Sequence, residues 1–224
     1  MNLPNKLSIL RIMMVPLFVV AYFLPFSWAP YIALGIFILA ALTDLLDGYI
    51  ARKYNLVTDL GKLLDPIADK ILVCAALFCV AVTNPLRHSF GGIFVMGSEI
   101  SSLQIGHVFF AVSGALVLSR ELLIDAVRQI AASKGTVVQA NIFGKVKTVL
   151  LDISLPVLIV AESLARELDF LSHVSTYFPD LQLIDEVYTV INWVGLILFA
   201  LAIIMTVISG IVYIVQNRKV FEEK

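Results

Sequence analysis

The chain has 224 residues, of which 60% are hydrophobic and 15% charged, and its formal net charge is −1. Soluble domains carry roughly 45 to 50% hydrophobic residues and about 25% charged ones. The composition therefore excludes an ordinary soluble protein and indicates an all-α integral membrane protein, and no nucleic-acid partner is expected. A helix needs about 20 apolar residues to cross a bilayer. The apolar segments predict six transmembrane helices in one domain, residues 1–224.

The first apolar segment follows Lys6 and Arg11 and continues to about residue 24. A positive end before an apolar run resembles a signal peptide, but no small-residue cleavage site follows and further apolar segments do, so we expect this helix to be retained. Asn5 or Ser8 is expected to cap its start. Two interpretations of Arg11 are open, namely a snorkelling anchor at the membrane surface and a phosphate contact.

The second and third apolar segments, residues 31–54 and 60–82, carry acidic side chains where they approach each other. These are Asp44 and Asp47 in the second segment, and Asp65 and Asp69 in the third. We expect the two segments to form a helical hairpin with its turn at 55–59, so that all four carboxylates lie at one depth. Because a charge at the bilayer centre costs about 2.5 to 3.5 kcal/mol on insertion scales, such a group needs a partner or a function.

The second half of the chain predicts three more spans and two long connections. A loop over 84–105, rich in Gly, Ser and Pro, precedes a fourth span at 106–132. The fifth span is expected from about 145 to 164, a second long connection over 166–187, and the sixth span at 188–215. No function is readable from the two connections.

Positive residues are distributed unequally between the two sides of this arrangement. Only Arg87 and Arg166 fall on one side. The other side holds Lys6, Arg11, Arg52, Lys53, Lys62, Lys134, Lys145, Lys147, Arg218, Lys219 and Lys224. The positive-inside rule therefore places both termini and the acidic hairpin on the cytoplasmic face of the cell membrane.

The spacing of the four aspartates predicts a metal site. Asp44 and Asp47 are three residues apart, and Asp65 and Asp69 are four apart. In a helix, each spacing places both side chains on one face. Two such faces form a carboxylate cage that suits Mg²⁺ or Mn²⁺, and two ions can act together on a phosphorus centre.

Small and basic residues beside the aspartates predict a phosphate ligand. Gly48 and Gly61 lack a Cβ, which allows a ligand to approach the helix backbone closely. Arg52 provides a planar set of donors for phosphate oxygens. Pro66 removes one amide donor, so a helix that begins before it is locally distorted.

These residues together resemble a known family signature. The pattern is Asp44-x-x-Asp47-Gly48-x-x-Ala51-Arg52, eight residues, then Gly61-x-x-x-Asp65-x-x-x-Asp69. It is similar to the complete signature of the CDP-alcohol phosphatidyltransferases, and the six-span length fits that family over the whole chain. The resemblance implies that the aspartates bind two divalent cations, Mg²⁺ or Mn²⁺, and that Asp69 also acts as the general base. It assigns the nucleotide to Gly48, Ala51, Arg52 and Gly61.

The acceptor is expected to be anionic. Four basic residues lie in the inner halves of the fourth and fifth spans, namely Arg120, Arg128, Lys145 and Lys147. They either bind this acceptor or anchor the helices at the membrane surface. Arg120-Glu121 and Gly144-Lys145-x-Lys147-Thr148 are similar to segments of the bacterial phosphatidylglycerophosphate synthases. That branch transfers the phosphatidyl group of CDP-diacylglycerol to glycerol 3-phosphate, releasing CMP.

Other functions remain open. Within the family, the acceptor of a cardiolipin, phosphatidylserine or phosphatidylinositol-phosphate synthase is an alternative. From another class, intramembrane carboxylates also occur in divalent-cation transporters. The resemblance implies a homodimer, although no G-x-x-x-G pair marks an interface. Asp125, Asp152 and Glu162 are assigned structural roles.

Overall fold

The computed structural model describes residues 3–54, 59–86, 102–133, 142–174 and 181–218, and it contains six long helices and no strand within these ranges. The side chains of some residues near the α2–α3 junction, including Asp47, are outside the described part. The helices are α1 (Leu3–Tyr22), α2 (Ala29–Lys53), α3 (Asp59–Thr83), α5 (Ser102–Ser133), α6 (Ile142–Val174) and α7 (Leu181–Gln216). The predicted all-helical class and the number of long helices are confirmed.

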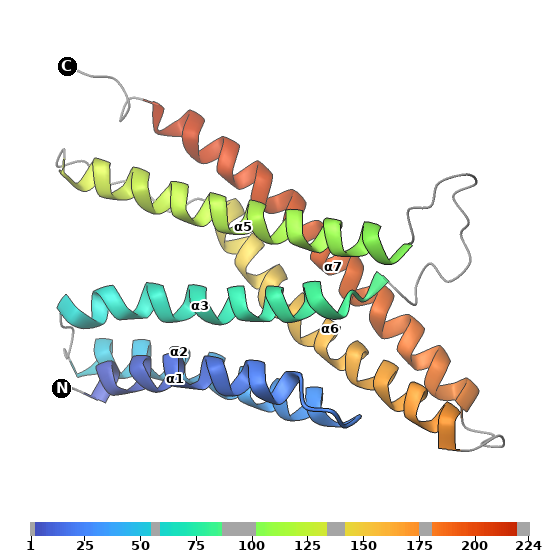
Figure 1. The fold of residues 1–224 in the computed structure, drawn as a ribbon. Helices are drawn as coiled ribbons and strands as arrows, with labels where there is room; N and C mark the ends of the chain where they lie inside the picture. The colour runs from blue at the N-terminus through green and yellow to red at the C-terminus, as the bar shows by residue number, and fades with distance from the viewer. Residues whose placement is uncertain (1–2, 55–58, 87–101, 134–141, 175–180, 219–224) are drawn as a thin grey trace.

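The helices form two groups in the bundle. α1 packs along α2 and α3, and α5 lies beside α3 with its axis in a similar direction (Figure 1). α6 and α7 are packed against each other along their length and cross the other helices at an angle (Figure 1). The start of α1 and the end of α7 lie at the same end of the bundle (Figure 1). This agrees with an even number of crossings, while the cytoplasmic location of that end remains a prediction.

One apolar core joins all six helices. It contains Phe18, Phe37, Val80, Phe110, Leu155 and Phe199, one from each helix. The rings of Phe110 and Phe199 have centroids 5.3 Å apart, which connects α5 to α7. Many large apolar side chains on the outer faces are exposed, for example Leu122 and Val190. This inside-and-outside apolar pattern is typical of helices that pack together within lipid.

Five of the helices contain an apolar stretch that is long enough to cross a membrane. The exception is α2, whose apolar stretch is the shorter Ala29–Asp44. The reason is chemical, because acidic and basic residues occupy the last turns of this helix from Asp44 onward. The last turns of α2 are therefore polar, and they lie next to the start of α3.

The expected connection over 166–187 is wrong in its bounds. α6 continues to Val174 and α7 already begins at Leu181. The charged residues that suggested a loop are accommodated within α6, because Arg166 Nε donates to Glu162 Oε1 at 2.8 Å, one helical turn away. The other expected loop, 84–105, is shortened by α5, which begins at Ser102, and its residues 87–101 lie outside the described part of the chain.

A close contact fixes α3 against α5 at the far end of the bundle from the acidic hairpin. Asn84 follows the last turn of α3 with φ of 53°, a left-handed conformation that asparagine tolerates at helix ends. Its side chain lies against Gly106 of α5, where an added Cβ would be 2.0 Å from Asn84 Oδ1. A larger residue at this position would require the Asn84 side chain to move.

Candidate active site

The first helix binds both halves of the acidic hairpin. Arg11 Nη1 lies 2.7 Å from Asp44 Oδ1 on α2, and Ser8 Oγ donates to Asp65 Oδ1 on α3 at 2.6 Å. The Arg11 side chain is 0% exposed, whereas that of Asp44 is 43% exposed. α1 thus orients two of the four predicted metal ligands.

Two expectations for α1 are corrected by these contacts. Arg11 does not snorkel, because its guanidinium is buried inside the bundle against a carboxylate. Ser8 is not a helix cap, because α1 already begins at Leu3 and the Ser8 hydroxyl is directed across to α3. Both side chains serve the site at the ends of α2 and α3.

The carboxylates on α2 and α3 have the chemistry that a divalent cation requires. The charges of Asp69 and Asp44 interact although the two residues belong to different helices. Like charges so placed are stabilised by a bound cation. Among the described side chains, no three acidic, histidine or cysteine residues lie close enough to hold one ion. Asp47 is outside that set, so the four-aspartate cage stays a prediction.

The predicted nucleotide residues lie at the junction of α2 and α3. Gly48, Ala51 and Arg52 belong to the last turns of α2, and their side-chain positions are outside the described part. Gly61 is buried in the first turn of α3. Pro66 lies within α3, which continues through it to Thr83.

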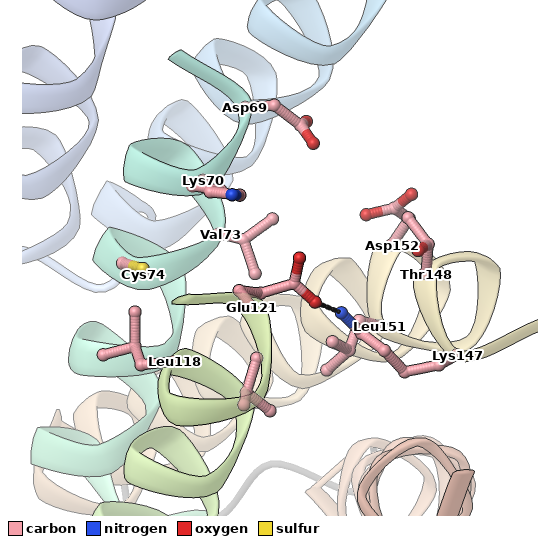
Figure 2. A pocket seen from close by; sticks show the side chains of 11 residues that line it. Asp69, Lys70, Val73, Cys74, Leu118, Glu121, Lys147, Thr148, Leu151 and Asp152 are labelled. Atoms are coloured by element: carbon pink, nitrogen blue, oxygen red, sulfur yellow. Dashed lines mark hydrogen bonds and ion pairs between the residues drawn. The ribbon is translucent and has the colours of Figure 1, made fainter. Parts of the chain in front are cut away.

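A cavity opens beside Asp69, between α3, α5 and α6. The space in it that the centres of water-sized molecules can occupy is about 60 Å³. It is lined by Asp69, Lys70, Val73, Cys74, Val117, Leu118, Glu121, Lys147, Thr148, Leu151 and Asp152. Figure 2 shows the carboxylate of Asp69 near one end of this group and the Glu121–Lys147 pair farther along α5 and α6. The cavity therefore has Asp69 and Lys70 toward one end and the Glu121–Lys147 pair toward the other.

Glu121 organises the cations at the second end of the cavity. Its Oε1 atom accepts from Lys147 Nζ at 2.5 Å and lies 2.8 Å from Arg120 Nη1. The Lys147 side chain is only 6% exposed. Arg120 Nε also donates to Ser209 Oγ on α7 at 3.2 Å. A single carboxylate thus fixes two cations at the junction of α5, α6 and α7.

Glycine allows this junction to form. An added Cβ at Gly144 would lie 2.9 Å from Arg120 Nη2, so the guanidinium of Arg120 passes directly over the backbone of α6. The Gly144-Lys145-x-Lys147 spacing consequently places Lys147 beside the carboxylate that also holds Arg120. Glu121 was not predicted to have a role, and its sequence neighbour Arg120 was the available signal.

The other two predicted acceptor residues lie elsewhere. The Arg128 guanidinium lies over the Tyr213 ring, 6.0 Å from its centroid, and so joins α5 to α7. Lys145 is exposed, and neither it nor Arg128 lines the cavity. Of the four predicted acceptor residues, the structure brings Lys147 to the cavity and Arg120 next to it.

The three acids that were assigned structural roles divide into two groups. Asp125 on α5 forms an ion pair with Lys70, which follows Asp69 in α3. Glu162 forms an ion pair with Arg166 in α6. Asp152, in contrast, lines the cavity. Asp152 follows Thr148 by four residues, which places both side chains on one face of α6, and both line the cavity.

Sequence similarity to known proteins identifies the family of this chain. Residues 1–208 match the family model described as CDP-alcohol phosphatidyltransferase. The chain belongs to this family. The match includes every residue of the signature read from the sequence, and it confirms the resemblance.

Individual relatives of this phosphatidyltransferase are named for particular acceptors. A Bacillus subtilis protein named CDP-diacylglycerol--glycerol-3-phosphate 3-phosphatidyltransferase is 33% identical over 228 residues, which cover 96% of this chain and 95% of that protein. A Rickettsia felis protein of the same name is 38% identical, over 71% of this chain and 75% of its own. A rice protein named cardiolipin synthase (CMP-forming) is 40% identical, over 66% of this chain and 42% of its own.

Proposed function

We propose that this phosphatidyltransferase transfers the phosphatidyl group of CDP-diacylglycerol to sn-glycerol 3-phosphate and releases CMP. The observation that carries the proposal is the cavity that has Asp69 near one end and the Lys147–Glu121–Arg120 cluster near the other. The names of the Bacillus subtilis and Rickettsia felis relatives support the same acceptor, and the first of these is similar over nearly the full length of both chains.

The acceptor matches the cavity in the order of its groups. Glycerol 3-phosphate has a primary hydroxyl at one end and a phosphate at the other. A carboxylate suits the hydroxyl that must lose its proton, and an ammonium and a guanidinium suit the phosphate. The phosphate competes with Glu121 for Lys147 and Arg120, which Glu121 already holds close together.

The reaction is a displacement at phosphorus. Asp69 accepts the proton of the primary hydroxyl, and the hydroxyl oxygen forms a bond to the β-phosphorus of CDP-diacylglycerol. The bond from that phosphorus to the bridging oxygen breaks, and its electron pair leaves with CMP. Asp44, Asp47, Asp65 and Asp69 would hold Mg²⁺ or Mn²⁺, two ions in this proposal, which stabilise the phosphoryl charge.

The donor binds at the α2–α3 junction in this proposal. Gly48, Ala51 and Gly61 leave space for the cytidine diphosphate near the helix backbone, and Arg52 pairs with its phosphate oxygens. The acyl chains stay in the lipid, beside the exposed apolar faces of the helices. The excess of positive residues on one side supports a site on the cytoplasmic face of the cell membrane, which the water-soluble glycerol 3-phosphate reaches from the cytoplasm. A homodimer is inferred from the family alone.

An acceptor panel tests this assignment. The purified protein is incubated with CDP-diacylglycerol, Mg²⁺ or Mn²⁺, and one acceptor at a time, and CMP release is measured. The acceptors are glycerol 3-phosphate, phosphatidylglycerol, serine and inositol phosphate. Glycerol 3-phosphate is expected to give the highest kcat/KM, whereas a higher value for any other acceptor would contradict the proposal.

The second candidate function is that of a cardiolipin synthase, with phosphatidylglycerol as the acceptor. The name of the rice relative supports this candidate. That protein is similar over 42% of its own length, against 95% for the Bacillus subtilis protein. A phosphodiester also carries less charge than the terminal phosphate of glycerol 3-phosphate, and so makes less use of two adjacent cations. Glycerol 3-phosphate is therefore the better fit.

A further inference from the structure

Asp152 is a carboxylate in the cavity without a direct partner in the described part of the chain. It lies on α6, five residues after Lys147, and is exposed to the cavity. Figure 2 shows its carboxylate across the cavity from Asp69, on the same helix as Lys147 and Thr148. Its charge interacts with those of Asp69 and Lys147. Asp152 is thus close to both ends of the proposed acceptor site.

Within the described part of the chain, no ion pair accounts for the position of Asp152. The two ammonium groups that line the cavity are paired with other acids, since Lys147 lies 2.5 Å from Glu121 and Lys70 lies against Asp125. The charge of Asp69 repels that of Asp152. A carboxylate on a membrane helix that is placed near another carboxylate is costly, and such residues usually mark a binding function.

The order of groups along the cavity defines what Asp152 binds. If the reacting hydroxyl lies at Asp69 and the phosphate at Lys147, the middle of the acceptor passes Asp152. A carboxylate accepts hydrogen bonds and repels phosphate, so the matching group is a hydroxyl. In glycerol 3-phosphate the middle carbon carries one.

We propose that Asp152 accepts a hydrogen bond from the secondary hydroxyl of the acceptor and thereby selects acceptors in which a hydroxyl lies between the reacting hydroxyl and the phosphate. This inference rests on the proposed function. It adds a specificity-determining residue that is separate from the four aspartates of α2 and α3. The hydrogen bond also orients the acceptor, because three contacts along its length fix which hydroxyl faces Asp69.

The test compares two acceptors that differ in one hydroxyl. They are glycerol 3-phosphate and 3-hydroxypropyl phosphate, which lacks the secondary hydroxyl. Hydrogen bonds to charged groups correspond to roughly a 10- to 100-fold change in affinity. Wild-type protein is expected to prefer glycerol 3-phosphate by about this factor in kcat/KM. Asp152→Ala is expected to remove the preference by lowering only the value for glycerol 3-phosphate.

Two further variants make the test specific. Asp152→Asn keeps an acceptor oxygen without the charge, so it is expected to retain part of the preference for glycerol 3-phosphate. This variant decides the test if Asp152→Ala does not accumulate. Asp169→Ala removes an exposed aspartate at the other end of the same helix and is expected to leave both kcat/KM values unchanged. The KM for CDP-diacylglycerol is expected to stay constant in all variants.

Several outcomes would overturn the inference. Equal losses for the two acceptors in Asp152→Ala would show a structural role, and a raised Mn²⁺ requirement with both acceptors would show a metal ligand. Equal use of both acceptors by the wild type would show that the secondary hydroxyl is not recognised, although the proposed function would stand. No turnover of glycerol 3-phosphate by the wild type would instead contradict the proposed function itself.

Discussion

At the scale of single residues, Glu121 stabilises two cations, Arg120 and Lys147, inside an apolar bundle. Lys147 is nearly fully buried, and a buried ammonium is stable only when it is paired. Glu121 supplies that pair and holds Arg120 with the same oxygen. Because the carboxylate of Glu121 is partly exposed, the phosphate of the proposed acceptor is expected to share these cations.

The two lysines of α6 are expected to differ in function. Lys147→Ala removes a charged donor from the cavity and is expected to raise the KM for glycerol 3-phosphate about 10-fold or more, with the KM for CDP-diacylglycerol unchanged. Lys145→Ala is the matched comparison, because Lys145 is two residues away and exposed outside the cavity. Steady-state kinetics with each substrate varied in turn measure the difference. Equal effects of the two variants would argue that both lysines only anchor the helix.

At the scale of helices, α1 acts as a support for the hairpin of α2 and α3. Its contribution comes from two polar side chains, Arg11 and Ser8, each of which binds an aspartate of the metal signature. The ends of α2 and α3 carry like charges, so their approach depends on such contacts. The amino-terminal helix therefore supports the candidate active site and is also long and apolar enough to cross a membrane.

Arg11→Met tests this support. The variant leaves Asp44 without its buried partner, so the free energy of unfolding is expected to fall by about 1 to 3 kcal/mol. Arg11→Lys keeps the charge but has a single donor group, so a smaller loss is expected. Thermal unfolding in detergent measures both. A melting temperature for Arg11→Met equal to that of the wild type would contradict a supporting role of this ion pair.

The contact between α3 and α5 gives a second prediction for the helices. Gly106→Ala places a methyl group on the Asn84 side chain and is expected to destabilise the protein by about 1 to 3 kcal/mol. Gly114→Ala is the control in the same helix, because no atom lies within 4 Å of its added Cβ. Helix propensity alone favours that alanine by up to about 1 kcal/mol. If both variants had the same stability, the close approach of Asn84 would be disproved.

At the scale of the whole molecule, the sequence was sufficient for the class of fold and for the family. The length of an apolar segment is a local property of the sequence. The spacing of Asp44 from Asp47 and of Asp65 from Asp69 is also local. The sequence does not predict the end of α6, because Arg166 and the acidic residues after it resemble a connection, whereas Arg166 pairs with Glu162 within one helical turn.

Contacts between helices were the part that the sequence could not supply. Lys147 and Glu121 are 26 positions apart, and nothing in their local patterns indicates that they meet. The burial of Arg11 against Asp44 likewise depends on how α1 packs. For the same reason Arg128 and Lys145 were grouped with the acceptor site, because depth along a helix was known but the direction of each side chain around it was not.

The proposed roles of Asp69, Lys147 and Asp152 all depend on the transfer of a phosphatidyl group to glycerol 3-phosphate. The most direct measurement supplies the reconstituted protein with CDP-diacylglycerol and labelled glycerol 3-phosphate, and follows the label into the lipid phase by extraction and mass spectrometry. The expected result is one phosphatidylglycerophosphate per CMP released, with no product from Asp69→Asn. Release of CMP without labelled lipid, or full activity of Asp69→Asn, would contradict the account.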